Sequence, residues 1–92
     1  MKKKDFILEV EDFSIATEDW KKESYEDGIN IGITAWYPGG AMVDDHIVEN
    51  FPELEDIGIE DETEGFMSYY DEDLTVEEIT ERLEELGFTI KK

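Results

Sequence analysis

The 92-residue chain has no cysteine, one histidine and only eight lysine or arginine residues. Without cysteine it can form no disulfide framework and no thiolate nucleophile or metal ligand. No stretch approaches the roughly 20 apolar residues that cross a bilayer, and four acids, at Asp5, Glu9, Glu11 and Asp12, interrupt what a signal peptide would need as its apolar segment. Because anionic lipid also repels an acidic surface, these absences favour an intracellular, cytoplasmic protein without a membrane partner.

Motifs for catalysis and metal binding are scarce as well. His46 follows Asp44 and Asp45, but residues one and two apart on a helix do not face each other, so neither acid is placed to orient the imidazole. No serine lies in a nucleophile motif, and no glycine-rich phosphate loop follows a strand. The run Asp71–Asp73 begins like an EF-hand loop, but Val76 stands where that loop requires glycine. We therefore expect no enzymatic activity, no cofactor and no dedicated metal site.

The hydrophobic residues make up 39% of the chain and fall in periodic stretches, so we predict one folded domain over residues 1–92 despite a formal net charge of −19. Alternating apolar and polar residues predict strands over 6–15 and 29–37. Apolar residues at helical spacing predict a helix over 42–51, which Pro52 limits.

The second half of the chain predicts a hairpin and a helix. Strands over 57–59 and 66–70 flank an acidic connection, which is read as a loop longer than the tightest turns. The final helix begins at Thr75, where Glu78 completes a capping box, and a short strand over 88–90 follows it. The predicted fold class is α+β, with an antiparallel sheet of four or five strands and two helices on one face.

The dominant feature is charge. Asp and Glu number 27, and between Glu23 and Ile90 there are 21 acids and a single base. Such a surface repels itself and lowers the stability of the compact state. On the final helix Glu77, Glu81 and Glu85 are like charges four residues apart, an arrangement that destabilises a helix. Stability alone would not select this face, which indicates a function for the charge, with solubility or adaptation to salt as the alternative.

The spacing of the carboxylates indicates a partner. Acids three and four apart on a helix lie about 5–6 Å from each other, and alternate residues of an extended segment lie about 6.5–7 Å apart. Neighbouring phosphates on a nucleic-acid strand have a similar spacing, so these carboxylates can occupy positions where a basic protein binds phosphates. The predicted phosphate-mimicking residues are Glu53, Glu55, Asp56, Glu60, Asp61, Glu62, Glu64, Asp71, Glu72, Asp73, Glu77, Glu78, Glu81, Glu84 and Glu85.

In its small size, lack of cysteine, extreme acidity and mixed fold, the chain resembles the DNA-mimic proteins with which phages disarm host nucleases. These are the anti-restriction and anti-CRISPR proteins, and the chain looks most like the anti-restriction nuclease proteins of T-even phages. The resemblance covers the whole chain in length and charge and carries no signature motif. It implies a protein that occupies the DNA channel of a nuclease without chemistry of its own.

We therefore predict a DNA mimic that inhibits a basic DNA-binding protein, such as a restriction or CRISPR nuclease or a histone-like protein, and that binds no nucleic acid itself. Trp36, Tyr69 and Tyr70, if exposed, would be its apolar anchors. The alternative is an immunity-type inhibitor of a nuclease toxin, which would carry one compact patch with a few hot spots. Two rows of carboxylates spanning the molecule would favour the mimic. The sequence leaves open the target and whether two copies pair into a homodimer that lengthens the charged surface.

Overall fold

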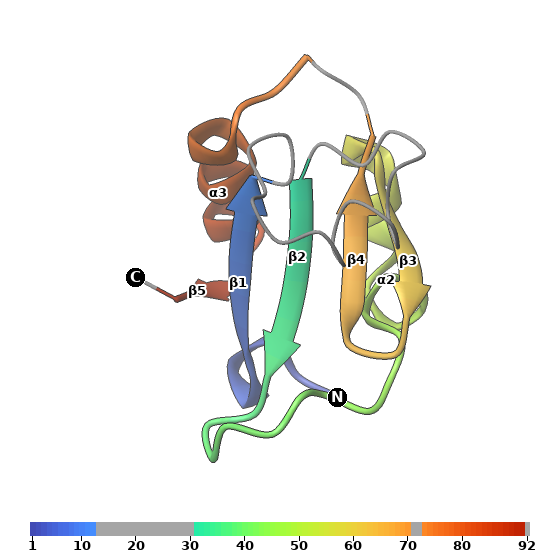
Figure 1. Ribbon diagram of the computed structural model, residues 1–92, viewed down its shortest axis with the longest axis vertical. Helices are drawn as coiled ribbons and strands as arrows, with labels where there is room; N and C mark the ends of the chain where they lie inside the picture. Colours follow the sequence, from blue (N-terminus) through green and yellow to red (C-terminus); the bar gives the residue numbers. More distant parts are fainter. Residues whose placement is uncertain (13–30, 71–72, 92) are drawn as a thin grey trace, which may run out of the picture.

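Five strands form one sheet, in the order β3-β4-β2-β1-β5, in the computed structural model of the protein, which describes residues 1–12, 31–70 and 73–91 (Figure 1). The strands are β1 (Ile7–Asp12), β2 (Ile31–Trp36), β3 (Ile59–Thr63), β4 (Phe66–Tyr69) and β5 (Thr89–Ile90). All neighbours pair antiparallel except β1 and β5, which are parallel. The predicted α+β class is confirmed, and the sheet is mixed rather than purely antiparallel.

The helical segments cover one face of this sheet, behind the strands in Figure 1. They are η1 (Lys3–Asp5), α2 (Ile47–Asn50), η3 (Pro52–Ile57) and α3 (Val76–Glu85). The helix α3 packs against β1 and β5, whereas α2 packs against β3 and β4 and η3 packs against β3. The two helical groups therefore lie over opposite edges of the sheet. Because α3 runs back along β1, the chain re-enters the sheet parallel to that strand, which explains the β1–β5 pair.

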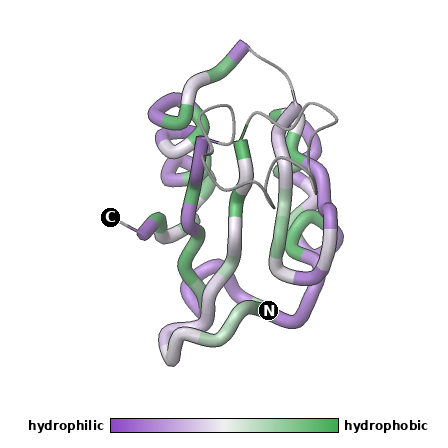
Figure 2. Tube along the Cα trace, in the orientation of Figure 1, coloured by the Kyte–Doolittle hydropathy of each residue, from purple (hydrophilic) through white to green (hydrophobic). Residues whose placement is uncertain are grey.

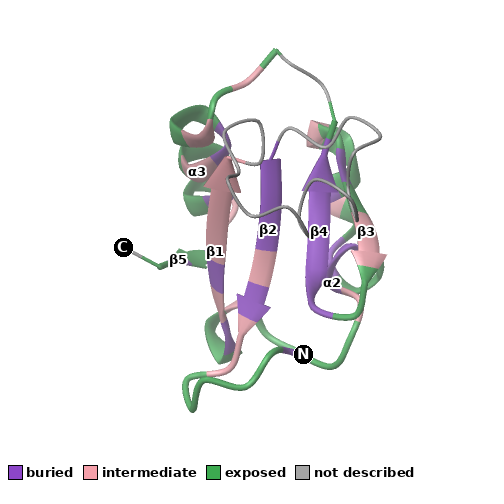
Figure 3. Cartoon of the chain, viewed as in Figure 1, coloured by how far each residue is buried: buried purple, intermediate pink, exposed green. Residues whose placement is uncertain are grey.

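The core lies between the sheet and the helices. Alternate residues of the central strands point into it, among them Leu8, Ile33 and Met67, all of which are fully buried. The apolar stripe of α3 meets them through Ile79 and Leu83. Figure 3 shows the consequence for the sheet, in which β4 is buried along its whole length and β2 along most of it. This core explains how the chain folds despite its charge.

The final helix and the two first strands agree with the sequence prediction. The Thr75 hydroxyl accepts a hydrogen bond from the Glu78 amide at 3.3 Å, as expected of a capping box. Gly87, with φ of 97°, takes the left-handed conformation that ends α3. The strands predicted over 6–15 and 29–37 are present as β1 and β2, and their predicted residues 13–15 and 29–30 lie outside the described residues.

The predicted helix over 42–51 is wrong in its first half. Only Ile47–Asn50 is α-helical, and Pro52 begins the separate 3₁₀ helix η3. Met42 instead forms a β-bridge with Trp36, and the Val43 amide donates to the Ala35 carbonyl at 2.9 Å. Because these backbone groups are bonded to the sheet, they are unavailable for a helix. Met42 and Val43 therefore lie in an extended segment that pairs with β2, although their spacing fits a helix.

The predicted long hairpin loop is also wrong, because β3 extends through the acidic residues as far as Thr63. The turn is only Glu64 and Gly65, with an irregular register between Asp61 and Thr63. Gly65 has φ of 74°, and a Cβ atom there would lie 2.2 Å from the Val43 carbonyl oxygen. Glycine is therefore required at this turn, and the acids of this segment stand on a strand instead of a loop.

Candidate acidic interaction surface

Lys3 and Lys91 both form ion pairs with carboxylates of the same chain. Lys3 Nζ lies 2.8 Å from the Glu53 carboxylate and donates to the Leu86 carbonyl, which ends α3, at 2.5 Å. The same ammonium lies 5.0 Å from the centre of the Phe88 ring. Its hydrogen bond holds the pKa of Glu53 below its usual range. Lys3 therefore joins η1, η3 and the end of α3, and Glu53 is not a free member of the acidic surface.

The acids of α3 are exposed on the side of the helix away from the core. They are Glu77, Glu78, Glu81, Glu84 and Glu85. Asp73, just before the helix, is exposed as well, whereas the predicted residues Asp71 and Glu72 lie outside the described residues. Because Ile79 and Leu83 face the core, the acids three and four apart lie in rows about 5–6 Å apart along the helix surface.

A second group of exposed acids lies at the opposite edge of the sheet. It consists of Glu55 and Asp56 on η3, Glu60 on β3 and Glu64 in the hairpin turn. The sheet order places β3 three strand spacings from β1, which is about 14 Å. Figure 2 shows hydrophilic residues along both sides of the molecule, on α3 and on β3, with hydrophobic positions between them. Among the described residues, the exposed acids that were predicted to mimic phosphates therefore form two groups, and further exposed acids lie outside both, at Asp5, Asp44, Asp45 and Glu49.

Asp61 belongs to neither group, because it caps α2. Its two carboxylate oxygens accept hydrogen bonds from the Val48 amide at 3.0 Å and the Glu49 amide at 3.1 Å. These are donors that the start of a helix leaves unpaired, and a negative charge at that position also favours the helix dipole. His46 Nδ1 lies 4.0 Å from the same carboxylate. Asp61 therefore has a structural role at the start of α2, which the sequence analysis did not predict, and its predicted role toward a partner stays a prediction.

Glu62 is held on the face of the sheet opposite the helices. Its Oε1 atom accepts hydrogen bonds from the buried Ser68 hydroxyl at 2.5 Å and from the Tyr70 hydroxyl. The bond to Glu62 raises the pKa of Tyr70, because a phenol that donates to a carboxylate resists losing its proton. Glu62 therefore stabilises the β3–β4 contact, on the same face of the sheet as the exposed Glu60, whose charge also raises the pKa of Tyr70.

The three predicted aromatic anchors differ in exposure. Tyr69 is 4% exposed and packs in the core, so it cannot contact a partner. Tyr70 is 38% exposed. Trp36 is half-buried, and its indole N–H donates to Glu9 at 3.2 Å. Of the three, Trp36 and Tyr70 have accessible surface.

Sequence reasoning named Trp36 but missed its bridge partner Met42, and these two residues form an apolar patch at the end of β2, named here the β2-end patch. Met42 is 45% exposed and bridges to Trp36. The Tyr37 hydroxyl donates to the exposed Asp44 at 3.0 Å, and this bond raises the pKa of Tyr37. The available signal was the aromatic pair directly before Pro38-Gly39-Gly40, since a turn at a strand end leaves such side chains accessible.

Neither a metal-binding cluster nor a membrane-spanning helix is present in the described part of the chain. Within residues 1–12, 31–70 and 73–91, no group of three or more His, Asp or Glu side chains could hold a metal ion. No helix of the described chain is both long enough and apolar enough to cross a membrane. No protein-family model, curated protein or solved structure matches the chain. Arguments about function therefore depend on the arrangement of charge and aromatic surface.

Proposed function

We propose that the protein is a DNA mimic, which binds the nucleic-acid site of a basic protein such as a restriction or CRISPR nuclease and inhibits it competitively. The observation that carries the proposal is that the described acids predicted to mimic phosphates, where they are exposed, lie in two groups, one at α3 and one on η3 and the β3–β4 hairpin. A duplex likewise presents two phosphate strands with a groove between them. One compact acidic patch would have favoured a different class of inhibitor.

The dimensions of the two groups support this comparison. The ten residues of α3 make a helix about 15 Å long, along which carboxylates recur every 5–6 Å or so. The strand β3, which carries part of the second group, lies three strand spacings from β1, the strand against which α3 packs. This distance is about 14 Å, comparable with the roughly 12 Å width of the major groove. A protein surface that binds phosphates on both sides of a groove would therefore meet carboxylates at comparable positions.

The charge balance also supports a basic partner. Between residues 31 and 86 the described chain has sixteen acids and one base, Arg82. Lys3 and Lys91, whose ammonium groups bind carboxylates of the same chain, neutralise little of this field. Such a potential attracts a positively charged surface over a long range and repels nucleic acid. The protein therefore needs no chemistry of its own to block a DNA-binding site.

The proposal is tested by competition. The protein is titrated into a complex of fluorescently labelled duplex DNA with each member of a panel of restriction and CRISPR nucleases. We expect release of free DNA from the target without a ternary complex, and no binding of the protein to DNA alone. The matched control is the E77Q/E81Q/E85Q variant, which keeps the helix and removes three charges. A stable complex of target, DNA and protein would contradict the proposal.

One observation favours the alternative of an immunity-type inhibitor of a nuclease toxin. The β2-end patch places exposed apolar surface beside Asp44 and Asp45, which are both exposed. A binding site with a few hot spots has this composition. The two functions differ in their response to single substitutions: in a mimic the loss of binding is spread over many acids, whereas in an immunity-type inhibitor Met42→Ala or Asp44→Ala alone would abolish it.

A further inference from the structure

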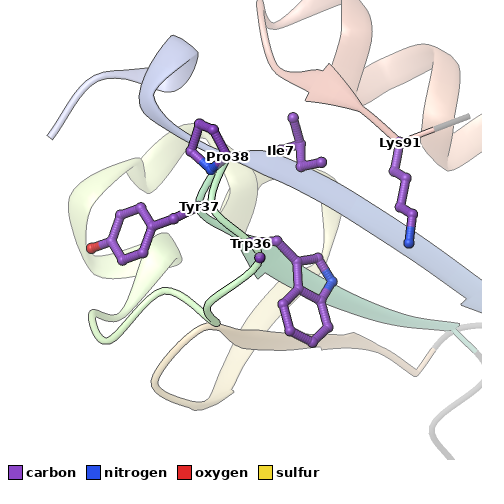
Figure 4. Close-up of a pocket in the computed structure, with 6 residues that line it drawn as sticks. Ile7, Trp36, Tyr37, Pro38 and Lys91 are labelled. Carbon is purple, nitrogen blue, oxygen red and sulfur yellow. The ribbon is translucent and has the colours of Figure 1, made fainter.

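A small pocket opens on the face of the sheet opposite the helices, near the start of β1 and the end of β2. Its volume is about 250 Å³, and its lining includes Ile7, Trp36, Pro38 and Lys91. Ile7 and Trp36 are direct partners across the β1–β2 pair. Figure 4 shows the Trp36 and Lys91 side chains extending in the same direction, while Tyr37 points away from both. The volume is below the roughly 300–1,000 Å³ of sites for drug-sized ligands, which suits one side chain better than a cofactor.

Glu9 lies beside this pocket and binds two of the residues that line it, Trp36 and Lys91. One of its oxygens accepts a hydrogen bond from the Trp36 indole N–H at 3.2 Å, and the other accepts one from Lys91 Nζ at 3.1 Å. The chain thus fills part of the site with its own alkyl-ammonium side chain. Lys91 is 54% exposed, so this ion pair is open to solvent and to exchange. The site therefore combines an aromatic ring and aliphatic walls with a carboxylate at its margin.

We propose that the pocket receives an arginine side chain of the basic partner, which replaces Lys91 on Glu9. A guanidinium group is planar and weakly hydrated, stacks on an indole and can bind a carboxylate through two parallel hydrogen bonds, none of which an ammonium group does as well. The formal net charge of −19 attracts a cation and opposes an anionic ligand in the same space. That the arginine comes from a protein partner rests on the proposed function, whereas the preference of the pocket for guanidinium does not.

The test uses a small probe and no target protein. The indole N–H signal of Trp36 is followed by NMR in a Trp20→Phe background, which leaves Trp36 as the only indole. The probes are the N-acetyl, N-methylamide derivatives of arginine, lysine and leucine. We expect the arginine probe to shift the Trp36 signal in a saturable way, and the other two to bind more weakly. Glu9→Gln should weaken the arginine probe.

The competing lysine gives a sharper test with a matched control. Lys91→Met removes the ammonium group and keeps a side chain of similar length, and it should tighten the arginine probe about two- to fivefold, since an exposed ion pair of this kind is worth up to about a factor of five. Lys4→Met changes the net charge equally at another exposed position and should leave the affinity nearly unchanged. Amide spectra confirm that each variant is folded.

Several results would overturn the inference. Equal binding of the leucine probe would mean an apolar pocket, equal binding of the lysine probe would remove the preference for guanidinium, and the absence of any shift would mean no site. Equal effects of Lys91→Met and Lys4→Met would show that only overall charge matters. If no probe binds but the protein displaces DNA from a nuclease, the mimic proposal stands and the pocket inference is wrong. If the arginine probe binds but DNA is not displaced, the pocket inference stands and the mimic proposal is wrong.

Discussion

The two acidic edges of the molecule differ in what their carboxylates do. On α3 all five acids are exposed, and Glu77, Glu81 and Glu85 are like charges four residues apart. At the β3 edge, by contrast, Asp61 caps α2 and Glu62 binds two hydroxyl groups of β4 and its continuation. The same two amino acids thus stabilise the fold at one edge and burden it at the other. Acidity alone therefore does not identify a binding residue.

The largest expected effect is the difference in stability between alanine substitutions at two glycines, Gly65 in the β3–β4 turn and Gly87 at the end of α3. Gly65 and Gly87 both have positive φ, but a Cβ atom at Gly65 would lie 2.2 Å from a backbone carbonyl oxygen, whereas at Gly87 the nearest atom is Cδ of the Lys3 side chain at 3.6 Å, an ordinary van der Waals distance. In both Gly→Ala variants the left-handed backbone conformation lowers the free energy of unfolding by about 1 kcal/mol. Gly65→Ala should lose roughly 3 kcal/mol or more in total, because the backbone must also shift.

Urea denaturation of both variants measures this difference. If Gly65→Ala were no less stable than Gly87→Ala, the packing of the hairpin turn against the 41–45 segment would be looser than described.

The next largest effect is the difference in stability between substitutions of two neighbouring acids of β3, Asp61 and Glu60. Asp61→Ala removes the acceptor of two amide hydrogen bonds at the start of α2 and should lower the free energy of unfolding by about 1–2 kcal/mol. Glu60→Ala, at an exposed position on the same strand, is the matched control and should change it by less than about 0.5 kcal/mol. Equal losses in thermal and urea melts would mean that the cap contributes nothing and that Asp61 belongs with the exposed acids.

These contrasts also show what the sequence could predict. The period of two in β1 and β2 and the capping box at Thr75 depend on local spacing, so those elements were predicted correctly. The acids of α3 were recognised as exposed for the same reason, because the apolar stripe fixes the other face of the helix.

Non-local contacts account for the errors. Met42 and Val43 have helical spacing, yet the sheet takes their backbone groups. The role of Asp61 depends on α2, thirteen residues earlier in the chain, and the ion pair of Glu53 depends on Lys3. Neither partner stands near these acids in the sequence. The β2-end patch likewise arises from a turn that returns Met42 to Trp36, a pairing that composition does not reveal.

A smaller effect on stability, of opposite sign, is expected on α3. Replacing Glu77, Glu81 and Glu85 by Gln removes two like-charge pairs at spacing i, i+4 and should stabilise the fold by up to about 1 kcal/mol. Binding to the target should weaken substantially, while each single substitution costs at most about 1 kcal/mol of binding. Thermal melts and binding titrations on the same samples measure both quantities. Loss of binding from one single substitution would favour the immunity-type inhibitor.

The smallest expected effect is that of salt on the melting temperature. It distinguishes the repulsion among all the acids from the repulsion among the acids of α3. Raising sodium chloride from 0.1 M to 1 M shortens the Debye length from about 10 Å to about 3 Å, which relieves repulsion among the acids, so the wild-type melting temperature should rise by several degrees. Because the same screening weakens attraction to a basic partner, affinity should fall over this range. The E77Q/E81Q/E85Q variant should show a smaller rise, since it has fewer repelling charges, whereas Asp61→Ala should keep the wild-type slope. A flat melting temperature would mean that bound cations or protons already neutralise the acids, and an affinity insensitive to salt would mean a chiefly apolar interface centred on the β2-end patch.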